Sequence, residues 1–250
     1  RQFHHLVRIV PGNGKLIVNG EDKYLAEVLS MGAWSPIERF SLEGDTEWTA
    51  RLIENDGSEF AVIYKGRELG IVRWSLLGRH NVLNGLAAIA AANAVGADVA
   101  SVLPRLVEFQ SVKRRLENLG NAKGVTVYDD FAHHPTAIRT TLEGLRAKVG
   151  SARIVVAMEP RSNSMRLGSH AAEIAPSLDA ADAVVFLHRP ELSWDAGKVI
   201  SALRGHGQTA MTVDALIAEL KALAREGDHV VFMSNGGFEG APRRFLTTLA

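Results

Sequence analysis

Hydrophobic and polar residues alternate along four short stretches in the first part of the chain. These stretches span residues 36–42, 47–56, 59–66 and 68–75, and Gly or Asp-Gly steps punctuate them. Alternation with a period of two is typical of strands that bury one face. We therefore expect this part of the chain to form antiparallel strands and hairpins.

Segments with helical spacing flank these strands. We expect helices at residues 3–10, 23–30, from 81 onward and 98–109, and one further strand at residues 15–20. Asp98 is a candidate N-cap of the last of these helices. Pro104 comes early enough in that helix either to be tolerated or to kink it.

The pattern changes after about residue 112, where apolar runs alternate with amphipathic helices. The strand-like runs are residues 124–130, 153–159, 182–188, 209–213 and 228–234. Helices are expected from Pro135 in a first-turn position, from Asp214 to a stop at Gly227, and over residues 242–249. This alternation predicts a mostly parallel sheet covered on both faces. The fold class is therefore α/β: a mixed region over residues 1–111, then a doubly wound region over 112–250.

Composition narrows the function classes. The 250 residues carry 28 basic and 28 acidic side chains, so the basic excess of a nucleic-acid partner is missing. Cysteine is absent, which excludes thiolate zinc sites and a cysteine nucleophile. The longest apolar run, residues 85–96, is too short for a bilayer, and we expect no membrane partner. The chain starts at Arg1 inside a periodic segment, which we interpret as a fragment or processed form.

Polar clusters follow the predicted strands of the second region. They are "YDDFAHHP" at 128–135, "EPRSNSMR" at 159–166, "HRP" at 188–190 and "SNGGFEG" at 234–240. In an open parallel sheet, ligands bind outside the carboxyl ends of the strands. We therefore expect one binding edge built from several loops, although surface loops are often polar without a function.

The "YDDFAHHP" cluster allows several interpretations. His133 and His134 are adjacent, so both binding one metal ion is disfavoured, and their spacing matches no common ligand pattern. Their place just before a helix favours an anion such as phosphate, while the alternative is a helix cap or a buried hydrogen-bonding histidine. Asp130 ends a strand, where a carboxylate either accepts hydrogen bonds from ribose hydroxyls or caps the next helix.

A second polar cluster opens the long helix at residue 81. Asn81 and Asn84 share a helix face, and His80 precedes them. Amide side chains offer a donor and an acceptor together, which suits the edge of an adenine ring. The alternative is an ordinary helix start. The chain has no G-x-x-x-x-G-K-[ST] phosphate loop; its nearest segment, residues 11–16, has the wrong glycine spacing and lacks the hydroxyl.

Taken together, three of these segments resemble an ordered signature of the Mur ligase family of ATP-dependent, amide-forming enzymes of peptidoglycan synthesis. They are "GRHNVLNGLAAIAAANA" at 78–94, "VKRRLE" at 112–117 and "YDDFAHHP". The resemblance implies that residues 1–111 are the later part of the central ATPase domain. It also implies that residues 112–250 form the Rossmann-like C-terminal domain. The UDP-sugar domain, the phosphate loop and the magnesium-binding acids would lie upstream.

The resemblance also implies roles for individual residues. His80, Asn81 and Asn84 fall where the family contacts adenine, Arg115 lies near the nucleotide, and Asp130 matches the ribose-binding acid. His133 and His134 would face the phosphates or the acyl phosphate as catalytic residues. Arginine forks bind carboxylates in bidentate fashion. The candidates for holding a peptide substrate are Arg161, Asn163, Arg189 and Ser234.

The implied reaction has two steps. ATP with Mg²⁺ phosphorylates the carboxylate of UDP-N-acetylmuramate, and the amine of a murein tripeptide then displaces phosphate. We expect a cytoplasmic enzyme whose 250-residue part does not turn over alone. Three alternatives remain: a ligase that adds free L-alanine, a non-catalytic nucleotide- or peptide-binding module, and an NAD(P)-binding Rossmann domain. No G-x-G-x-x-G follows residues 124–130, which counts against the last.

Overall fold

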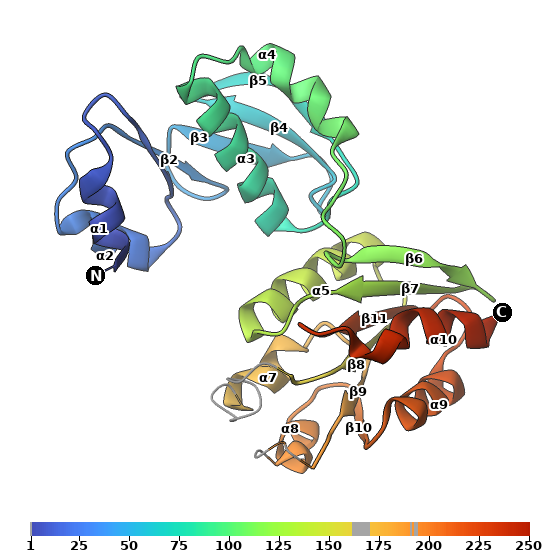
Figure 1. The fold of residues 1–250 in the computed structure, drawn as a ribbon. Helices are drawn as coiled ribbons and strands as arrows, with labels where there is room; N and C mark the ends of the chain where they lie inside the picture. The colour runs from blue at the N-terminus through green and yellow to red at the C-terminus, as the bar shows by residue number, and fades with distance from the viewer. Residues whose placement is uncertain (1, 162–170, 191, 193–194) are drawn as a thin grey trace. The chain divides into compact units, whose positions relative to one another are not determined.

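The chain folds into two compact units, Arg1–Gln110 and Ser111–Ala250. The computed structural model describes residues 2–161, 171–190, 192 and 195–250 (Figure 1). Each unit has its own sheet and its own hydrophobic core.

The first unit is built on a five-stranded mixed sheet in the order β1-β2-β3-β4-β5. Its elements are α1 (Gln2–Ile9), β1 (Leu16–Asn19), α2 (Lys23–Ser30), β2 (Ile37–Ser41), β3 (Trp48–Leu52), β4 (Glu59–Tyr64), β5 (Arg67–Arg73), α3 (Arg79–Ala94), α4 (Val99–Val102) and the 3₁₀ helix η1 (Leu103–Glu108). Strands β3, β4 and β5 are antiparallel as expected, but β2 pairs in parallel with both β1 and β3. The expectation of an antiparallel β2 was therefore wrong, because alternation reports which face is buried and not strand direction.

Helix α3 packs against this sheet over a core that includes the fully buried Trp48 and Phe60. A β-carbon placed on Gly85 would lie 2.8 Å from the ring of Trp74, so any side chain at this helix position would force that ring to shift. The small residues after Asn84 therefore have a packing role, whatever the role of the polar residues before them.

One buried carboxylate ties together the edge of this sheet. Glu38 accepts hydrogen bonds from Lys15 Nζ at 2.6 Å, from Trp48 Nε1 at 2.7 Å and from the Tyr64 hydroxyl at 3.4 Å. Burial acts to raise the pKa of Glu38, but the hydrogen bonds from Lys15 and Trp48 outweigh it and lower the pKa. The negative charge of the Glu38 carboxylate is thus balanced by Lys15 and by two further hydrogen-bond donors, and we assign this side chain a structural role.

The last helical segment of the first unit changes type at its proline. Asp98 caps α4 by accepting from the backbone N–H of Ala100 at 3.1 Å, as expected. The α-helix lasts only to Val102, and the 3₁₀ helix η1 continues it through Pro104. Proline carries no N–H to bond the carbonyl four residues earlier, and its ring crowds that carbonyl, so the regular α-helical pattern does not continue through Pro104.

The second unit is a six-stranded sheet in the order β10-β9-β8-β11-β7-β6 (Figure 1). Its elements are β6 (Glu117–Ala122), β7 (Val125–Asp130), α5 (Pro135–Val149), β8 (Ile154–Met158), α7 (Ala171–Ser177), β9 (Ala183–Leu187), α8 (Ala196–Ser201), β10 (His206–Ala210), α9 (Val213–Leu223), β11 (His229–Met233), the 3₁₀ helix η2 (Phe238–Gly240) and α10 (Ala241–Leu249). All pairs are parallel except β6 with β7. The predicted α/β class, with a Rossmann-like second region, is confirmed.

Helices cover both faces of this sheet. Helices α9 and α10 lie on one face, and α5, α7 and α8 lie on the other (Figure 1). Strands β8 and β9 are therefore buried along their whole length, which is why they are continuously apolar. Within the described ranges, no helix combines the length and the apolar character that crossing a bilayer requires.

Sequence patterns located most of these elements, with three differences. Strand β6 was not expected, because its sequence "ENLGNA" is polar and belongs to an edge strand. Strand β10 begins at His206 and ends at Ala210, earlier than expected, for the same reason. Helix α9 is capped by Thr212 and ends at Leu223, whereas Asp214 and Gly227 were expected at its ends.

Tyr128 in β7 and His229 in the neighbouring strand β11 form a titratable pair, so we expect the stability of the second unit to depend on pH. The Tyr128 hydroxyl and His229 Nδ1 share a hydrogen bond of 3.0 Å, and their rings stack. Burial lowers the pKa of His229 below its usual value; Asp228 opposes this shift and Arg146 adds to it. The unfolded chain therefore binds a proton more readily than the folded one does, and stability is lost as the pH falls below about 6.5.

His229→Gln keeps a polar group but removes the titration. We expect denaturant unfolding of the second unit between about pH 5 and pH 7 to be less pH-dependent in this variant than in the wild type. His206→Gln, at an exposed position of the same unit, is the control. An unchanged pH slope in His229→Gln would contradict the prediction.

Candidate functional site

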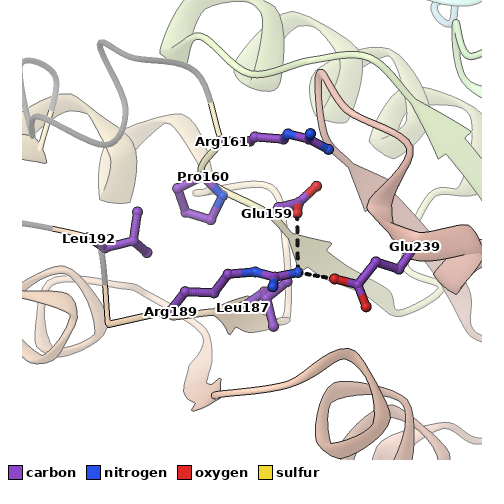
Figure 2. A pocket seen from close by; sticks show the side chains of 7 residues that line it. All are labelled: Glu159, Pro160, Arg161, Leu187, Arg189, Leu192 and Glu239. Atoms are coloured by element: carbon purple, nitrogen blue, oxygen red, sulfur yellow. Dashed lines mark hydrogen bonds and ion pairs between the residues drawn. The ribbon is translucent and has the colours of Figure 1, made fainter.

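A cavity of about 420 Å³ opens at the carboxyl ends of β8, β9 and β11 (Figure 2). It is lined by Glu159, Pro160, Arg161, Leu187, Arg189, Leu192 and Glu239. This is the edge where open parallel sheets bind their ligands, and the volume falls within the usual range of small-molecule sites, about 300–1,000 Å³. The cavity therefore combines two guanidinium groups, two carboxylates and an apolar wall.

Arg189 lies between the two carboxylates of the cavity (Figure 2). It is ion-paired with Glu239, and its Nη2 lies 3.7 Å from Glu159 Oε1. Glu159 is 7% exposed and accepts a hydrogen bond from the Ser234 hydroxyl at 2.6 Å. Glu159 therefore connects the floor of the cavity to the end of β11.

Arg161 extends along the backbone of the loop that follows β11. A β-carbon on Gly236 would lie 2.2 Å from Arg161 Nη1 and 2.5 Å from its Cδ. The first glycine of the pair in "SNGGFEG" therefore has a physical role, because Gly236 leaves space for the Arg161 side chain. The Gly236 N–H also donates to Ser234 Oγ at 2.9 Å, which fixes the loop beneath Arg161.

The structure brings most of the expected peptide-binding residues together. Arg161 and Arg189 both line the cavity, and Ser234 lies next to it through Glu159. Asn163 lies outside the described residues. The peptide-binding role of all four stays a prediction.

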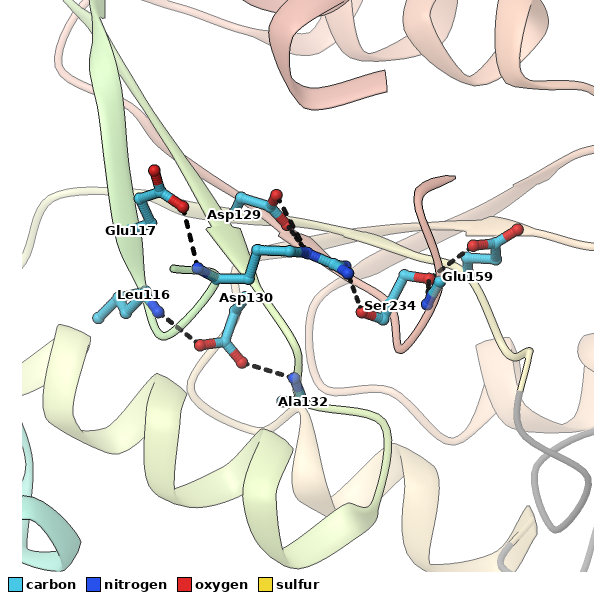
Figure 3. Close-up of polar contacts among 9 residues, drawn as sticks. Leu116, Glu117, Asp129, Asp130, Ala132, Glu159 and Ser234 are labelled. Carbon is cyan, nitrogen blue, oxygen red and sulfur yellow. Dashed lines mark hydrogen bonds and ion pairs between the residues drawn. The ribbon is translucent and has the colours of Figure 1, made fainter. Parts of the chain in front are cut away.

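The carboxylate of Asp130, at the end of β7, accepts hydrogen bonds from two backbone N–H groups (Figure 3). It is 3% exposed; Oδ2 accepts from Leu116 N at 2.6 Å and Oδ1 from Ala132 N at 2.7 Å. Burial raises the pKa of the Asp130 carboxyl, while the hydrogen bonds from Ala132 and Leu116 oppose that shift. The carboxylate thus fixes the turn around residue 116 to the strand end, and its predicted ribose contact would use its remaining lone pairs.

Arg114 links this strand end to the loop after β11. Its Nε donates to Asp129 Oδ1 at 3.3 Å and its Nη2 to the Ser234 carbonyl at 2.6 Å. Its backbone has a positive φ of 62°, uncommon outside glycine, and its N–H donates to Glu117 Oε2 at 2.9 Å. Burial raises the pKa of Asp129, and Arg114 opposes this shift. A continuous polar network therefore runs from Arg114 through Ser234 and Glu159 to the cavity.

Removing the Arg114 side chain should destabilise the second unit. Arg114→Ala leaves the partly buried Asp129 without its cation and the Ser234 carbonyl without its donor, and we expect a loss of about 1–3 kcal/mol in unfolding free energy. Arg204→Ala, which breaks the exposed pair with Asp179, is the matched control and should change stability by less than about 0.5 kcal/mol. Equal losses in the two variants, measured by urea unfolding, would contradict the prediction.

Cationic and imidazole groups surround the ring of Phe131. The guanidinium carbons of Arg114 and Arg115 each lie 5.4 Å from its centroid, and His133 meets it edge to face at 5.2 Å. His133 Nδ1 also bonds the Phe131 carbonyl at 2.9 Å. The structure therefore brings Arg115 and His133 together, as an anion site would require, and their nucleotide and catalytic roles stay predictions.

His134 sits at the start of α5. It is the N-cap residue, and its Nδ1 accepts from the Thr136 N–H at 3.3 Å. Pro135 follows in the first turn, as expected. One of the two histidines thus caps the helix, which was the alternative to an anion-binding role. His134 is exposed, and its contact with phosphate stays a prediction.

The candidate adenine residues lie on the first turns of α3 in the first unit. Asn81 Nδ2 donates to the Leu77 carbonyl at 2.7 Å, His80 is partly buried and Asn84 is exposed. Asn81 thereby holds the preceding loop, and its carboxamide oxygen remains available as an acceptor. Their contact with adenine stays a prediction.

In the part of the chain that the structure describes, no three His, Asp or Glu side chains are grouped closely enough to hold a metal ion. The polar network is instead made of carboxylates compensated by arginine and by backbone N–H groups. Glu159, Glu239 and Arg114 were not singled out from the sequence. Glu159 and Glu239 each belong to a cluster at a strand end, and Arg114 precedes Arg115 in "VKRRLE", so strand-end position was the available signal.

Comparison with known protein families gives two matches. Residues 1–92 match the family described as Mur ligase middle domain, and residues 114–236 match the family described as Mur ligase, glutamate ligase domain. The two matches follow the order of the two compact units along the chain.

Individual proteins with related sequences are named as UDP-N-acetylmuramate ligases. The chain is 46% identical, over its whole length, to the UDP-N-acetylmuramate--L-alanyl-gamma-D-glutamyl-meso-2,6-diaminoheptandioate ligase of Escherichia coli, of which it covers 54%. It is 37% identical, over 92% of its length, to the UDP-N-acetylmuramate--L-alanine ligase of Mycolicibacterium vanbaalenii, of which it covers 51%. The chain thus spans about half the length of these curated relatives.

A solved structure of the same kind is also similar. The murein peptide ligase of Psychrobacter arcticus superposes with a TM-score of 0.72 at 40% identity, over 99% of this chain and 54% of that chain. The fold of both units is therefore the one seen in that ligase.

Proposed function

This chain belongs to the Mur ligase family, and we propose that the whole protein is an ATP-dependent amide ligase of peptidoglycan recycling. The proposed reaction joins L-alanyl-γ-D-glutamyl-meso-diaminopimelate to UDP-N-acetylmuramate. In this proposal residues 1–111 are the later part of the central ATP-binding domain and residues 112–250 are the C-terminal domain. The two family matches and the two compact units support these boundaries.

The observation that carries the proposal is the cavity at the strand ends of the second unit. Arg161 and Arg189 line it together, and guanidinium forks bind carboxylates in a fixed, bidentate geometry. A tripeptide ending in diaminopimelate presents several carboxylates, whereas L-alanine presents one next to its reacting amine. A spacious cavity with two arginines suits the larger substrate.

The proposed chemistry has two balanced steps. The carboxylate of UDP-N-acetylmuramate attacks the γ-phosphorus of ATP, giving an acyl phosphate and ADP. The free amine of the tripeptide then attacks the acyl carbon, forming the amide and releasing phosphate and a proton. In this reaction Arg161 and Arg189 would anchor and orient the peptide, which raises the effective concentration of its amine.

In this proposal each unit has its own nucleotide-contacting residues, at the start of α3 in the first unit and at the strand end of β7 in the second. Arg115 and His133, gathered around Phe131, would face the phosphates of the nucleotide, with His134 at the adjoining helix start. Asp130 would take the ribose, and His80, Asn81 and Asn84 the adenine. Mg²⁺ would accompany ATP, but the described residues offer no cluster that fits it, so its ligands would come from elsewhere in the protein.

We also propose that the protein acts in the cytoplasm, where ATP and UDP-sugars are found. The alternative function is a ligase that adds L-alanine to the same acceptor, which the similarity to the Mycolicibacterium vanbaalenii enzyme keeps open. A non-catalytic nucleotide- or peptide-binding module is the second alternative. It predicts peptide binding without ATP consumption.

The test is a ligation assay with the full-length protein, ATP, Mg²⁺, UDP-N-acetylmuramate and the tripeptide, with the product identified by mass. We expect UDP-N-acetylmuramoyl-tripeptide together with one phosphate for each amide formed. Peptide binding with no product would favour the binding module. The 250-residue chain alone should give no product.

A further inference from the structure

The charges around the cavity of the second unit balance. Arg161 and Arg189 contribute two positive groups, and Glu159 and Glu239 contribute two negative ones (Figure 2). A ligand carboxylate with no cation beside it would have to displace Glu239 in order to bind Arg189. Glu159 and the displaced Glu239 would then both lie near the ligand carboxylate and repel it. A ligand end that carries an ammonium group beside its carboxylate brings its own partner for the displaced Glu239.

The two carboxylates differ in their freedom to respond to a ligand. Glu159 is held in place by the Ser234 hydroxyl and is almost fully buried, with a side chain 8% exposed. The Glu239 side chain is 55% exposed, and Arg189 is its partner in the cavity. The Glu239 side chain can therefore exchange its contact with Arg189 for a contact with a ligand at low cost. Glu159 stays in place and keeps Arg189 in position.

The backbone at Glu239 is strained in the way functional residues often are. Phe238 and Glu239 are consecutive non-glycine residues with positive φ angles of 48° and 49°. Phe238 is 1% exposed and packs against Phe232 in the core, which anchors the turn. This left-handed conformation is unfavourable for any residue that carries a side chain. It aims the Glu239 side chain at Arg189.

The rest of the lining is apolar. Pro160, Leu187 and Leu192 form that wall. It suits a short methylene chain that ends in the charged group. A 2,6-diaminoheptanedioate residue has this composition: methylene groups followed by a carbon that carries both a carboxylate and an ammonium.

From these observations, and resting on the proposed function, we propose that Glu239 determines specificity for a ligand end that carries an ammonium beside its carboxylate. Arg161 and Arg189 bind the carboxylate of the diaminopimelate side-chain end, and Glu239 leaves Arg189 to bind the adjacent ammonium. The cavity thereby selects diaminopimelate over a residue of the same length without the second amino group.

The experiment compares two tripeptides that differ in one amino group. One ends in meso-diaminopimelate and the other in 2-aminoheptanedioate, and binding to the full-length protein is measured by calorimetry. UDP-N-acetylmuramate and a non-hydrolysable ATP analogue are present so that no ligation occurs. We expect the wild type to bind the diaminopimelate peptide roughly tenfold more tightly, the size of one charge-assisted hydrogen bond.

Glu239→Gln should remove this preference without weakening the binding of the 2-aminoheptanedioate peptide. Asp214→Asn is the matched control, since it neutralises another exposed acid paired with an arginine, Arg244, outside the cavity. It should keep the preference. Glu239→Gly is a second variant that relieves the positive φ; it should lose the preference without a lower melting temperature.

Two results would overturn the inference: an unchanged preference in Glu239→Gln, or no preference in the wild type, including the case where neither peptide binds. A ligation assay run in parallel separates this inference from the proposed function. Ligation that proceeds while Glu239→Gln keeps the preference refutes only the inference. A preference that depends on Glu239 without any ligation refutes only the ligase proposal.

Discussion

Arg189→Ala in the full-length protein is expected to raise the KM for the tripeptide by about 10–100-fold, the loss of one charge-assisted interaction with a carboxylate. The substitution also leaves Glu159 and Glu239 facing the cavity without the cation between them, which adds repulsion against an anionic ligand. The KM values for ATP and UDP-N-acetylmuramate should stay close to those of the wild type, because the role proposed for Arg189 is confined to binding the peptide.

Arg189→Lys provides the graded comparison for this prediction. Lysine keeps the charge but not the planar fork, so it should recover part of the lost affinity. Steady-state kinetics with each substrate varied in turn separates the outcomes. A similar rise in KM for all three substrates would show that the substitution disturbs the fold and would contradict a peptide-specific role.

Asp130→Ala should be the most destabilising single change at the strand ends. It removes the acceptor of two backbone N–H groups, those of Leu116 and Ala132, and each unsatisfied buried group costs about 1–3 kcal/mol. We expect a loss of about 2–5 kcal/mol in the unfolding free energy of the second unit. Urea unfolding followed by circular dichroism measures it.

Asp130→Asn should lose less than the alanine variant, for two reasons. The amide keeps one acceptor oxygen, and it carries no charge, so the burial that raises the pKa of the Asp130 carboxyl no longer opposes folding. Asp179→Asn, at a partly exposed acid of the same unit, is the control and should be close to neutral. Equal stability of Asp130→Ala and the wild type would contradict the structural role of this carboxylate.

Much of the fold was predictable because burial leaves a periodic pattern in the sequence. Helix α2 was expected at residues 23–30 and lies there, and strands β8 and β9 were visible as apolar runs. The parallel pairing of β2 was not predictable, because its alternation would be the same in either direction. The edge strand β6 was missed, because it has few buried apolar residues to signal it.

The candidate site was predictable to the extent that strand ends determine it. Arg161 and Arg189 follow different strands, and the rule that ligands bind at the carboxyl ends of parallel strands placed both at one edge. The roles of Glu159 and Glu239 depend on pairing with Arg189 across separate loops, which no local pattern encodes. Arg114 was passed over for Arg115, because only the fold shows that its side chain reaches the Ser234 carbonyl.

The central claim is that the whole protein ligates a murein tripeptide in preference to a free amino acid. One competition experiment tests it most directly. The full-length protein is given ATP, Mg²⁺, UDP-N-acetylmuramate and equal concentrations of L-alanine and L-alanyl-γ-D-glutamyl-meso-diaminopimelate, and the two products are counted by mass spectrometry. The account predicts that UDP-N-acetylmuramoyl-tripeptide predominates. Predominance of UDP-N-acetylmuramoyl-L-alanine would contradict it.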